Sequence, residues 1–242
     1  MSLVEIVLVY QSLLGIYGDR GNAVVLRHRL RVRGRDAVVR VIEPGQPVPA
    51  TGAVYLLGGG ENAAQDSAVR HLKEDGHLFE AVARGAVLFA VCAGFQIAGR
   101  SFTTGDGDTV TEGLGLLDVE TRPGPTRAVG EILSTWTKPD GTDYALTGFE
   151  NHAGYTYLGA SAQPLGRVEV GLGNNGDGTE GAVQGHVIGT YPHGPVLARN
   201  PDLADHLLEL ALGVRLEPWP DAEVEELRRQ RLAWARKLAP RP

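Results

Sequence analysis

The stretch VLFAVCAGFQIAG, residues 87–99, contains the single cysteine of this 242-residue chain, at the point where an apolar run ends and small residues begin. Its first five residues are all apolar, which is typical of a strand buried on both faces of a parallel sheet. The residues after Cys92 can begin a helix, so Cys92 lies at a sharp turn from strand to helix. The stretch therefore predicts one strand–helix unit of an α/β sheet, with the Cys92 side chain at the carboxyl end of the strand.

Strand-like and helix-like segments alternate through the first hundred residues. The runs VEIVLVY, AVVRVI and AVYLL are separated by helical patterns that begin near residue 22, between residues 65 and 84, and at residue 93. Such alternation is typical of βαβ units and a parallel sheet. We therefore predict a three-layer, flavodoxin-like α/β fold with a mostly parallel, doubly wound sheet.

The region 101–190 has a different character, because it is rich in Gly, Thr and Asp. Its candidate strands are GLLDVET, VGEILSTW, VEVGLG and GAVQGHVIGTY. Turn residues between them favour hairpins, so we expect antiparallel strands that extend the sheet. Helical patterns return at 202–212 and at about 221–238. The sequence shows no repeat or linker, so we predict a single domain over 1–242. The apolar residues of its C-terminal helix are expected to cover the domain's own sheet, and a contact with a partner is the alternative.

Composition narrows the classes of partner. A net charge of −6 and a pI near 5.7 argue against nucleic acid, whose phosphates require a basic face. One segment, RHRLRVRGR at 27–35, carries five arginines on a predicted helix. Such a run indicates either a solvated helix face or a docking surface for an acidic partner.

The cysteine count and the N-terminus bear on location. A single cysteine excludes an internal disulfide, and no Cys/His cluster has zinc-ligand spacing, so no metal site is predicted. The N-terminus lacks a basic leader region, and no apolar run reaches eighteen residues. We therefore expect a cytoplasmic protein without direct membrane insertion.

Cys92 is the first candidate for chemistry. Its predicted place near a helix N-terminus favours the thiolate, which is the nucleophilic form. The alternative is an inert buried cysteine that packs as a small apolar side chain. The glycines of LLGGGEN, residues 56–62, end another predicted strand and leave backbone N–H groups accessible, as an oxyanion hole requires. An ordinary glycine-rich turn or a phosphate cradle is the alternative there.

Three other side chains, His193, Arg127 and His152, are further candidates for the site. His193, in TYPHGP, follows an apolar strand and is set among turn residues, so it can act as base to a distant cysteine. Arg127 precedes a strand and can bind a carboxylate in bidentate fashion. His152, in FENHAG, either contacts the substrate or caps a strand end.

Together these residues resemble the class I glutamine amidotransferases of the CobB/CobQ type. The resemblance rests on the order and spacing of four segments rather than on one motif. They are IYGDRGNAVVLRHRLRVRG at 16–34, YLLGGGEN at 55–62, GFENHAGYTYLG at 148–159 and GTYPHGPVLARNPDLAD at 189–205. The similarity runs from about residue 5 to residue 212.

The resemblance implies roles for the site residues. Cys92 would be the nucleophile, and His193 its general base and later acid. Arg127 falls where such enzymes bind the glutamine substrate. The N–H groups of Gly59 or Gly60 and of Ala93 would form the oxyanion hole.

Two departures from the family pattern stand out. Ala90 replaces the first glycine of the usual Gly-x-Cys-x-Gly turn. Pro195 stands where many members have a glutamate two residues after the histidine, and an acid there normally orients the imidazole. The third catalytic residue is therefore open: none, Glu150, or an acid from a partner, of which we favour the partner.

The resemblance also implies a reaction. The chain would hydrolyse L-glutamine and pass ammonia to a MurT-like Mur ligase subunit, which amidates D-glutamate of the lipid-linked precursor lipid II to D-isoglutamine. It needs no cofactor in this chain, because ATP and Mg²⁺ belong to the partner; the sequence has no Gly-Lys pair and hence no Walker A loop. Alternatives are an amidotransferase of the cobyric acid type, a γ-glutamyl hydrolase, or a catalytically silent binding module.

Overall fold

A six-stranded sheet forms the centre of the protein. The computed structural model describes residues 3–15, 18–104 and 109–238. The strand order is β11-β12-β4-β3-β1-β2, and every neighbouring pair is parallel except β11 with β12. The strands are β1 (Val4–Val9), β2 (Ala37–Ile42), β3 (Val54–Leu57), β4 (Val87–Val91), β11 (Ala182–Gln184) and β12 (Val187–Thr190). β1, β3, β4 and β12 are fully buried, as the apolar runs of β3 and β4 predict for those two strands.

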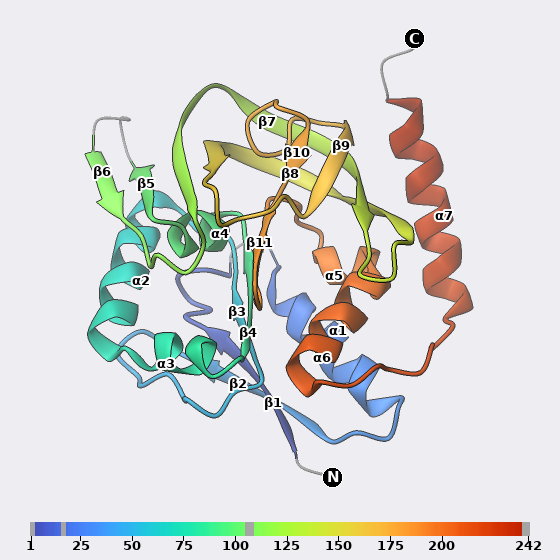
Figure 1. The fold of residues 1–242 in the computed structure, drawn as a ribbon, viewed down its shortest axis with the longest axis horizontal. Coiled ribbons are helices and arrows are strands. Elements are labelled where there is room, and N and C mark those ends of the chain that lie inside the picture. Colours follow the sequence, from blue (N-terminus) through green and yellow to red (C-terminus); the bar gives the residue numbers. More distant parts are fainter. Residues whose placement is uncertain (1–2, 16–17, 105–108, 239–242) are drawn as a thin grey trace.

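Helices cover both faces of this sheet. Figure 1 shows α2 and α3 on one side and α1 and α6 on the other, so the predicted three-layer, doubly wound architecture is confirmed. Gly76, in the left-handed conformation with φ of 75°, separates α2 from α3. The helices of these layers are α1 (Arg20–Arg31), α2 (Asn62–Asp75), α3 (His77–Ala83), α4 (Ala93–Ala98), α5 (Val196–Arg199) and α6 (Pro201–Leu212).

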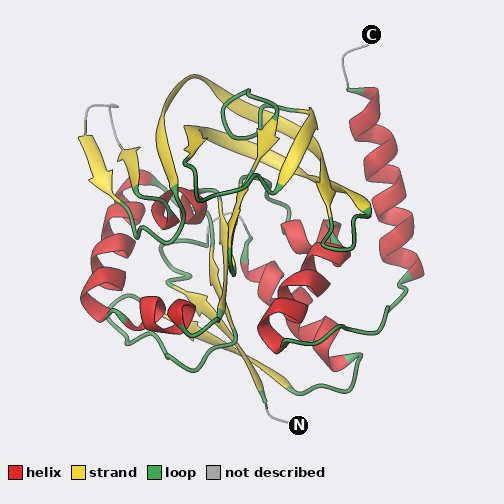
Figure 2. Cartoon of the chain, in the orientation of Figure 1, coloured by secondary structure: helices red, strands yellow, loops and turns green. Residues whose placement is uncertain are grey.

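The middle of the chain forms a second sheet instead of extending the first. It is ordered β10-β9-β7-β5-β6, with β8 paired to β7, and it lies across one end of the central sheet (Figure 2). The strands are β5 (Ser101–Thr104), β6 (Thr109–Glu112), β7 (Val119–Thr137), β8 (Asp143–Leu158), β9 (Gly166–Val170) and β10 (Thr179–Glu180). The predicted antiparallel strands are therefore confirmed, but only the segment that forms β11 and β12 joins the central sheet, and the others form a sheet of their own. The segments GLLDVET and VGEILSTW join in one long strand, whose register shifts between Pro123 and Ala128.

The arginine run on α1 has a structural role. Arg29 Nε and Nη2 donate to the two carboxylate oxygens of Asp205 on α6, at 2.5 and 2.6 Å. Arg33 Nη2 donates to the same carboxylate, and its Nε donates to the Glu217 carbonyl. These two of the five arginines therefore fasten α1 and the residues after it to α6, so the run is not simply a solvated face.

The C-terminal helix α7 (Ala222–Lys237) covers the second sheet. The Asp221 carboxylate caps its first turn by accepting from Val224 N. Arg228 donates to the Ala145 carbonyl and lies 3.9 Å above the Tyr144 ring, while Leu232 and Ala235 pack with Leu133 of β7 and Val170 of β9. Within the described ranges, no helix combines the length and the apolarity needed to cross a bilayer.

Close packing at Gly94 joins two loops of the central sheet. Gly94 N donates to Gly58 O at 3.0 Å, and a Cβ at residue 94 would lie 2.5 Å from the Leu57 carbonyl oxygen. We expect Gly94→Ala to lower the free energy of unfolding by about 1–3 kcal/mol, because the backbone must shift to admit the methyl group. Gly130→Ala is the control, since a Cβ there meets nothing within 4 Å. Urea unfolding measures both, and equal stabilities would contradict this packing argument.

Candidate active site

Four neighbouring strands of the central sheet end at one edge, and each is followed by a polar or glycine-rich segment. Cys92 follows β4, residues 58–60 follow β3, His193 lies just past β12, and Asp19 lies between β1 and α1. In open α/β sheets, ligands bind beyond the carboxyl ends of the strands. The strand order β12-β4-β3-β1 therefore gathers these segments, far apart in the sequence, at one place.

The Cys92 backbone has the strained geometry of a nucleophile turn. Its φ is 52° and its ψ is −106°, a region that residues other than glycine rarely occupy and that costs of order 1–3 kcal/mol. Cys92 N donates to Thr190 O of β12 at 2.8 Å, which holds the turn in place. The residue is 7% exposed, and Sγ lies 3.9 Å from the Asn151 carbonyl oxygen. The thiol is therefore fixed between the two sheets.

His193 is held beside Cys92 by its backbone. Its N–H donates to Phe149 O at 2.9 Å, and Phe149 N donates to His193 O at 3.2 Å, so β8 supports the segment after β12. Burial opposes the charged imidazole, but the Asp19 carboxylate and the Cys92 sulfur outweigh burial and raise the pKa of His193 to about 9. The pair can therefore exchange a proton, as nucleophilic catalysis requires.

Asp19 is the residue that sequence reasoning missed. It is 2% exposed, its Oδ1 lies 3.7 Å from His193 Nδ1, and its Oδ2 accepts a hydrogen bond from Gly59 N at 2.7 Å. The separation from the imidazole is that of an ion pair rather than a short hydrogen bond. The available signal was an acid directly before a helix, after a strand that belongs to the same sheet.

The bond to Asp19 corrects the expected role of Gly59. Its N–H is engaged by the carboxylate and is not available to stabilise an oxyanion. Gly60, the alternative donor, lines a cavity together with Cys92 and Ala93, the first residue of α4. Residues 58–60 and the turn at Cys92 are thus brought together, and Gly60 rather than Gly59 lines the cavity beside Cys92.

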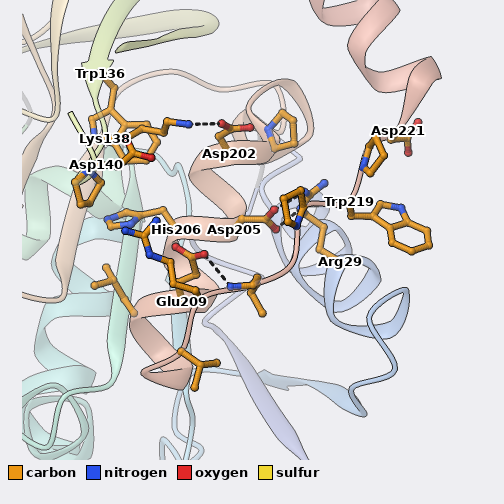
Figure 3. Close-up of a pocket in the computed structure, with 18 of the residues that line it drawn as sticks. Arg29, Trp136, Lys138, Asp140, Asp202, Asp205, His206, Glu209, Trp219 and Asp221 are labelled. Carbon is orange, nitrogen blue, oxygen red and sulfur yellow. Dashed lines mark hydrogen bonds and ion pairs between the residues drawn. The ribbon is translucent and has the colours of Figure 1, made fainter. Parts of the chain in front are cut away.

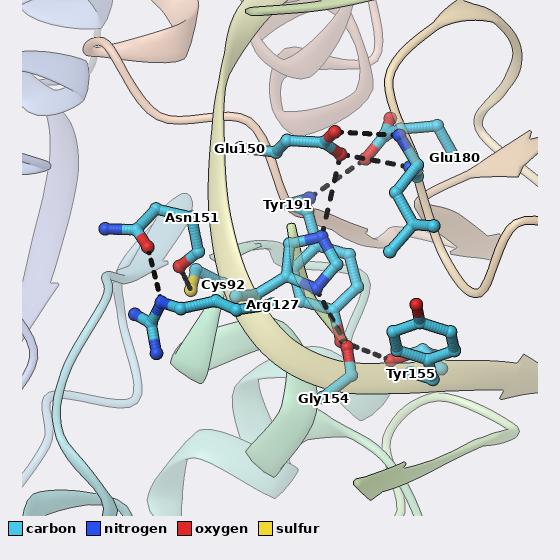
Figure 4. Close-up of polar contacts among 12 residues, drawn as sticks. Cys92, Arg127, Glu150, Asn151, Gly154, Tyr155, Glu180 and Tyr191 are labelled. Carbon is cyan, nitrogen blue, oxygen red and sulfur yellow. Dashed lines mark hydrogen bonds and ion pairs between the residues drawn. The ribbon is translucent and has the colours of Figure 1, made fainter. Parts of the chain in front are cut away.

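This cavity has a volume of about 200 Å³, which suits a small molecule such as one amino acid. Arg127 of β7 lines it from the second sheet, and Asn151 Oδ1 of β8 accepts from Arg127 Nε at 2.8 Å (Figure 4). Because Asn151 engages only the Nε–H, the two Nη groups can bind a carboxylate. Other polar side chains in the lining are Glu61, Asn62, Gln65, Gln96, Thr103 and His152.

Glu150 and His152 form a separate buried pair. The Glu150 carboxylate accepts from Leu172 N and Gly173 N, and its Oε2 lies 3.7 Å from His152 Nε2 (Figure 4). His152 Nδ1 lies 2.8 Å from Gly154 O, and the ring stacks on Tyr191 at 3.6 Å. Glu150 is thus engaged away from His193, so the suggestion that it orients His193 is wrong, and His152 holds the cavity wall.

A larger groove of about 770 Å³ lies between α6, the β7–β8 hairpin and residues 213–221 (Figure 3). It contains Trp136, Trp219 and His206, and several of its charged groups are already engaged. Lys138 bonds Asp202, Arg29 bonds Asp205, and Glu209 accepts from Leu216 N. Its lining has no cysteine or serine, so we do not place the chemistry in this groove.

Comparison with known proteins agrees with this geometry. Residues 5–201 match the CobB/CobQ-like glutamine amidotransferase domain. The chain belongs to this glutamine amidotransferase family. The matched region includes every strand end described above and stops at the start of α6, so α7 lies outside the family domain.

Individual members of the family refine the comparison. Over 213 residues the chain is 36% identical to the lipid II isoglutaminyl synthase (glutamine-hydrolyzing) subunit GatD of Staphylococcus aureus strain N315, covering 85% of this chain and 84% of that protein. The GatD subunit of Streptococcus pneumoniae strain R6 is 32% identical, covering 84% of this chain and 78% of that one. A crystal structure of a glutamine amidotransferase shares the fold, with a TM-score of 0.57, 22% identity, and coverage of 86% and 99%.

Proposed function

We propose that this chain is a glutaminase subunit that hydrolyses L-glutamine and delivers the ammonia to a MurT-like ligase subunit. The ligase would use it to amidate D-glutamate of lipid II to D-isoglutamine, as the name of the GatD relatives describes. The observation that carries the proposal is that Cys92 and Arg127 line one small cavity while His193 lies against Cys92. A nucleophile, a base and a carboxylate-binding cation are the groups that hydrolysis of a free amino acid amide needs.

The reaction begins at Cys92. The thiol passes its proton to His193, and the sulfur attacks the side-chain amide carbon of glutamine while Arg127 holds the α-carboxylate. Gly60 N–H and Ala93 N–H stabilise the oxyanion. His193 then protonates the amide nitrogen, the C–N bond breaks and ammonia leaves, so a γ-glutamyl thioester remains on Cys92.

Water completes the cycle. His193 takes a proton from water as the oxygen attacks the thioester carbon, and the C–S bond breaks. The sulfur recovers the proton from His193, and glutamate is released. This chain would need no cofactor for either half, and ATP and Mg²⁺ would belong to the ligase subunit. We place the pair in the cytoplasm, where a reducing environment keeps the thiol free.

Glutamate release from L-glutamine tests the proposal. The purified chain, alone and mixed with the candidate MurT-like subunit, should release glutamate and ammonia in equal amounts. Adding ATP, Mg²⁺ and lipid II to the mixture should move the ammonia into the D-glutamate amide. Hydrolysis of γ-glutamyl peptides in preference to glutamine would favour a γ-glutamyl hydrolase, and absence of turnover in every mixture would leave a binding module.

Arg127 gives a test of the substrate class. We expect Arg127→Ala to raise KM for glutamine about 10–100-fold with little change in kcat, because the charged hydrogen bonds to the α-carboxylate are lost. Arg122→Ala, an exposed position on the same strand, is the control and should keep the wild-type KM. Steady-state kinetics measure both, and an unchanged KM in the Arg127 variant would exclude its role in binding.

A further inference from the structure

Asp19 touches two parts of the proposed machinery at once. One carboxylate oxygen faces His193 Nδ1 at 3.7 Å, and the other accepts from Gly59 N at 2.7 Å. The side chain is almost completely enclosed, with 3% of its surface exposed. A carboxylate in such a place stays charged only if its oxygens are compensated, and these two contacts supply that compensation.

We propose that Asp19 is the positioning residue that orients His193 and ties it to the glycine loop. The inference rests on the glutaminase activity proposed above. An imidazole whose Nδ1–H faces a carboxylate keeps Nε2 for the thiol, and the charged imidazolium formed during proton transfer is stabilised. Because Asp19 also holds Gly59, the base and the neighbouring oxyanion donor Gly60 are fixed relative to each other.

Packing between the start of α1 and the segment after β12 explains how the acid can come from a distant part of the chain. Pro195 occupies the position two residues after His193, and its ring packs so closely against Gly21 that a Cβ at residue 21 would overlap it. Gly21 lies in the first turn of α1, so this contact brings the start of α1, with Asp19 just before it, against the His193 segment. The chain therefore brings an acid of its own to His193.

The charges around His193 are few, which makes its titration interpretable. Asp19 faces it from the segment before α1, and Cys92 faces it from the turn after β4. On its own segment the next charged group is Arg199, which is paired with Glu131 of β7. Asp19 and the Cys92 sulfur together keep the pKa of His193 above the usual range, and removing the Asp19 charge should lower that pKa.

Asp19→Asn tests the proposal, because asparagine keeps the shape and removes the charge. We expect kcat for glutamine to fall on the order of 10²-fold or more, with KM changed less than about threefold. The His193 ring should titrate near pH 9 in the wild type and at a lower pH in the variant. Long-range ¹H–¹⁵N NMR spectra, assigned with His193→Gln, measure this. Asp118→Asn is the matched control: its carboxylate also accepts a backbone N–H and faces an arginine, outside the cavity.

Two results would overturn the proposal. One is an Asp19→Asn variant with nearly wild-type kcat; the other is a variant whose loss is fully restored by the ligase subunit, since the acid would then come from the partner. If Asp19→Asn does not fold, the wild type alone provides the test: titration of its His193 at or below pH 6.5 would equally overturn the proposal. Absence of glutaminase activity in the wild type would contradict the proposed function alone, because the His193 titration still reports the contact with Asp19.

Discussion

Replacing Cys92 with alanine is expected to lower glutamine hydrolysis by at least about 10³-fold, to the limit of detection. The thioester has no other site at which to form, because Cys92 is the single cysteine of the chain. Binding of glutamine should persist, since Arg127 and the rest of the cavity are unchanged. Glutamate release measures the first effect, and isothermal titration with glutamine measures the second.

The same cysteine allows a chemical control. Iodoacetamide should label the wild type at one site, inactivate it in proportion to labelling, and be slowed by glutamine, whereas Cys92→Ala should not be labelled. The variant should unfold within a few degrees of the wild type, because only a small buried side chain is shortened. Retention of a tenth or more of the wild-type rate in Cys92→Ala would exclude a thioester mechanism.

His193→Gln should lower kcat on the order of 10²- to 10⁴-fold with little change in KM. Without the imidazole, the thiol keeps its proton and the departing nitrogen receives none, so both chemical steps slow. The backbone bonds to Phe149 do not involve the side chain and should survive. Iodoacetamide labelling of Cys92 at neutral pH should slow in parallel, which separates loss of the base from loss of binding.

His186→Gln is the matched control for His193. His186 lies just before β12, at the opposite end of the strand that leads to His193, and its Nδ1 contacts the Gly85 carbonyl. Its loss should leave kcat unchanged. Equal effects of the two substitutions would mean that His193 acts through the stability of the strand and not through proton transfer.

The site was predictable where each feature depends on neighbours in the chain. Cys92 was found because an apolar strand ends abruptly at a helix, and the structure gives that turn a positive φ. His193 and the glycine loop were found for the same reason, as strand ends with turn residues. Arg127 required the family resemblance, since nothing local distinguishes it from a surface arginine until Asn151 and the cavity are seen.

Asp19 and Gly59 could not be assigned from the chain alone. Whether an acid before a helix caps that helix or reaches another strand end depends on strand order, and Asp19 makes no cap bond to α1 while bonding Gly59, forty residues away. That bond removes Gly59 from the oxyanion hole. Distant contacts likewise explain the role of Glu150, whose carboxylate accepts hydrogen bonds from Leu172 N and Gly173 N and does not orient His193.

The alternation of strands and helices, the buried parallel sheet and the position of the thiol follow from local sequence, because apolar periodicity and turn residues act over a few neighbouring residues. Contacts between distant segments were needed to show that the middle of the chain forms a second sheet, that Arg29 fastens α1 to Asp205, and that Asp19 faces His193. These features follow from pairing between segments up to about 176 residues apart. Such pairing depends on how the whole core packs, and it cannot be predicted from any short stretch of sequence.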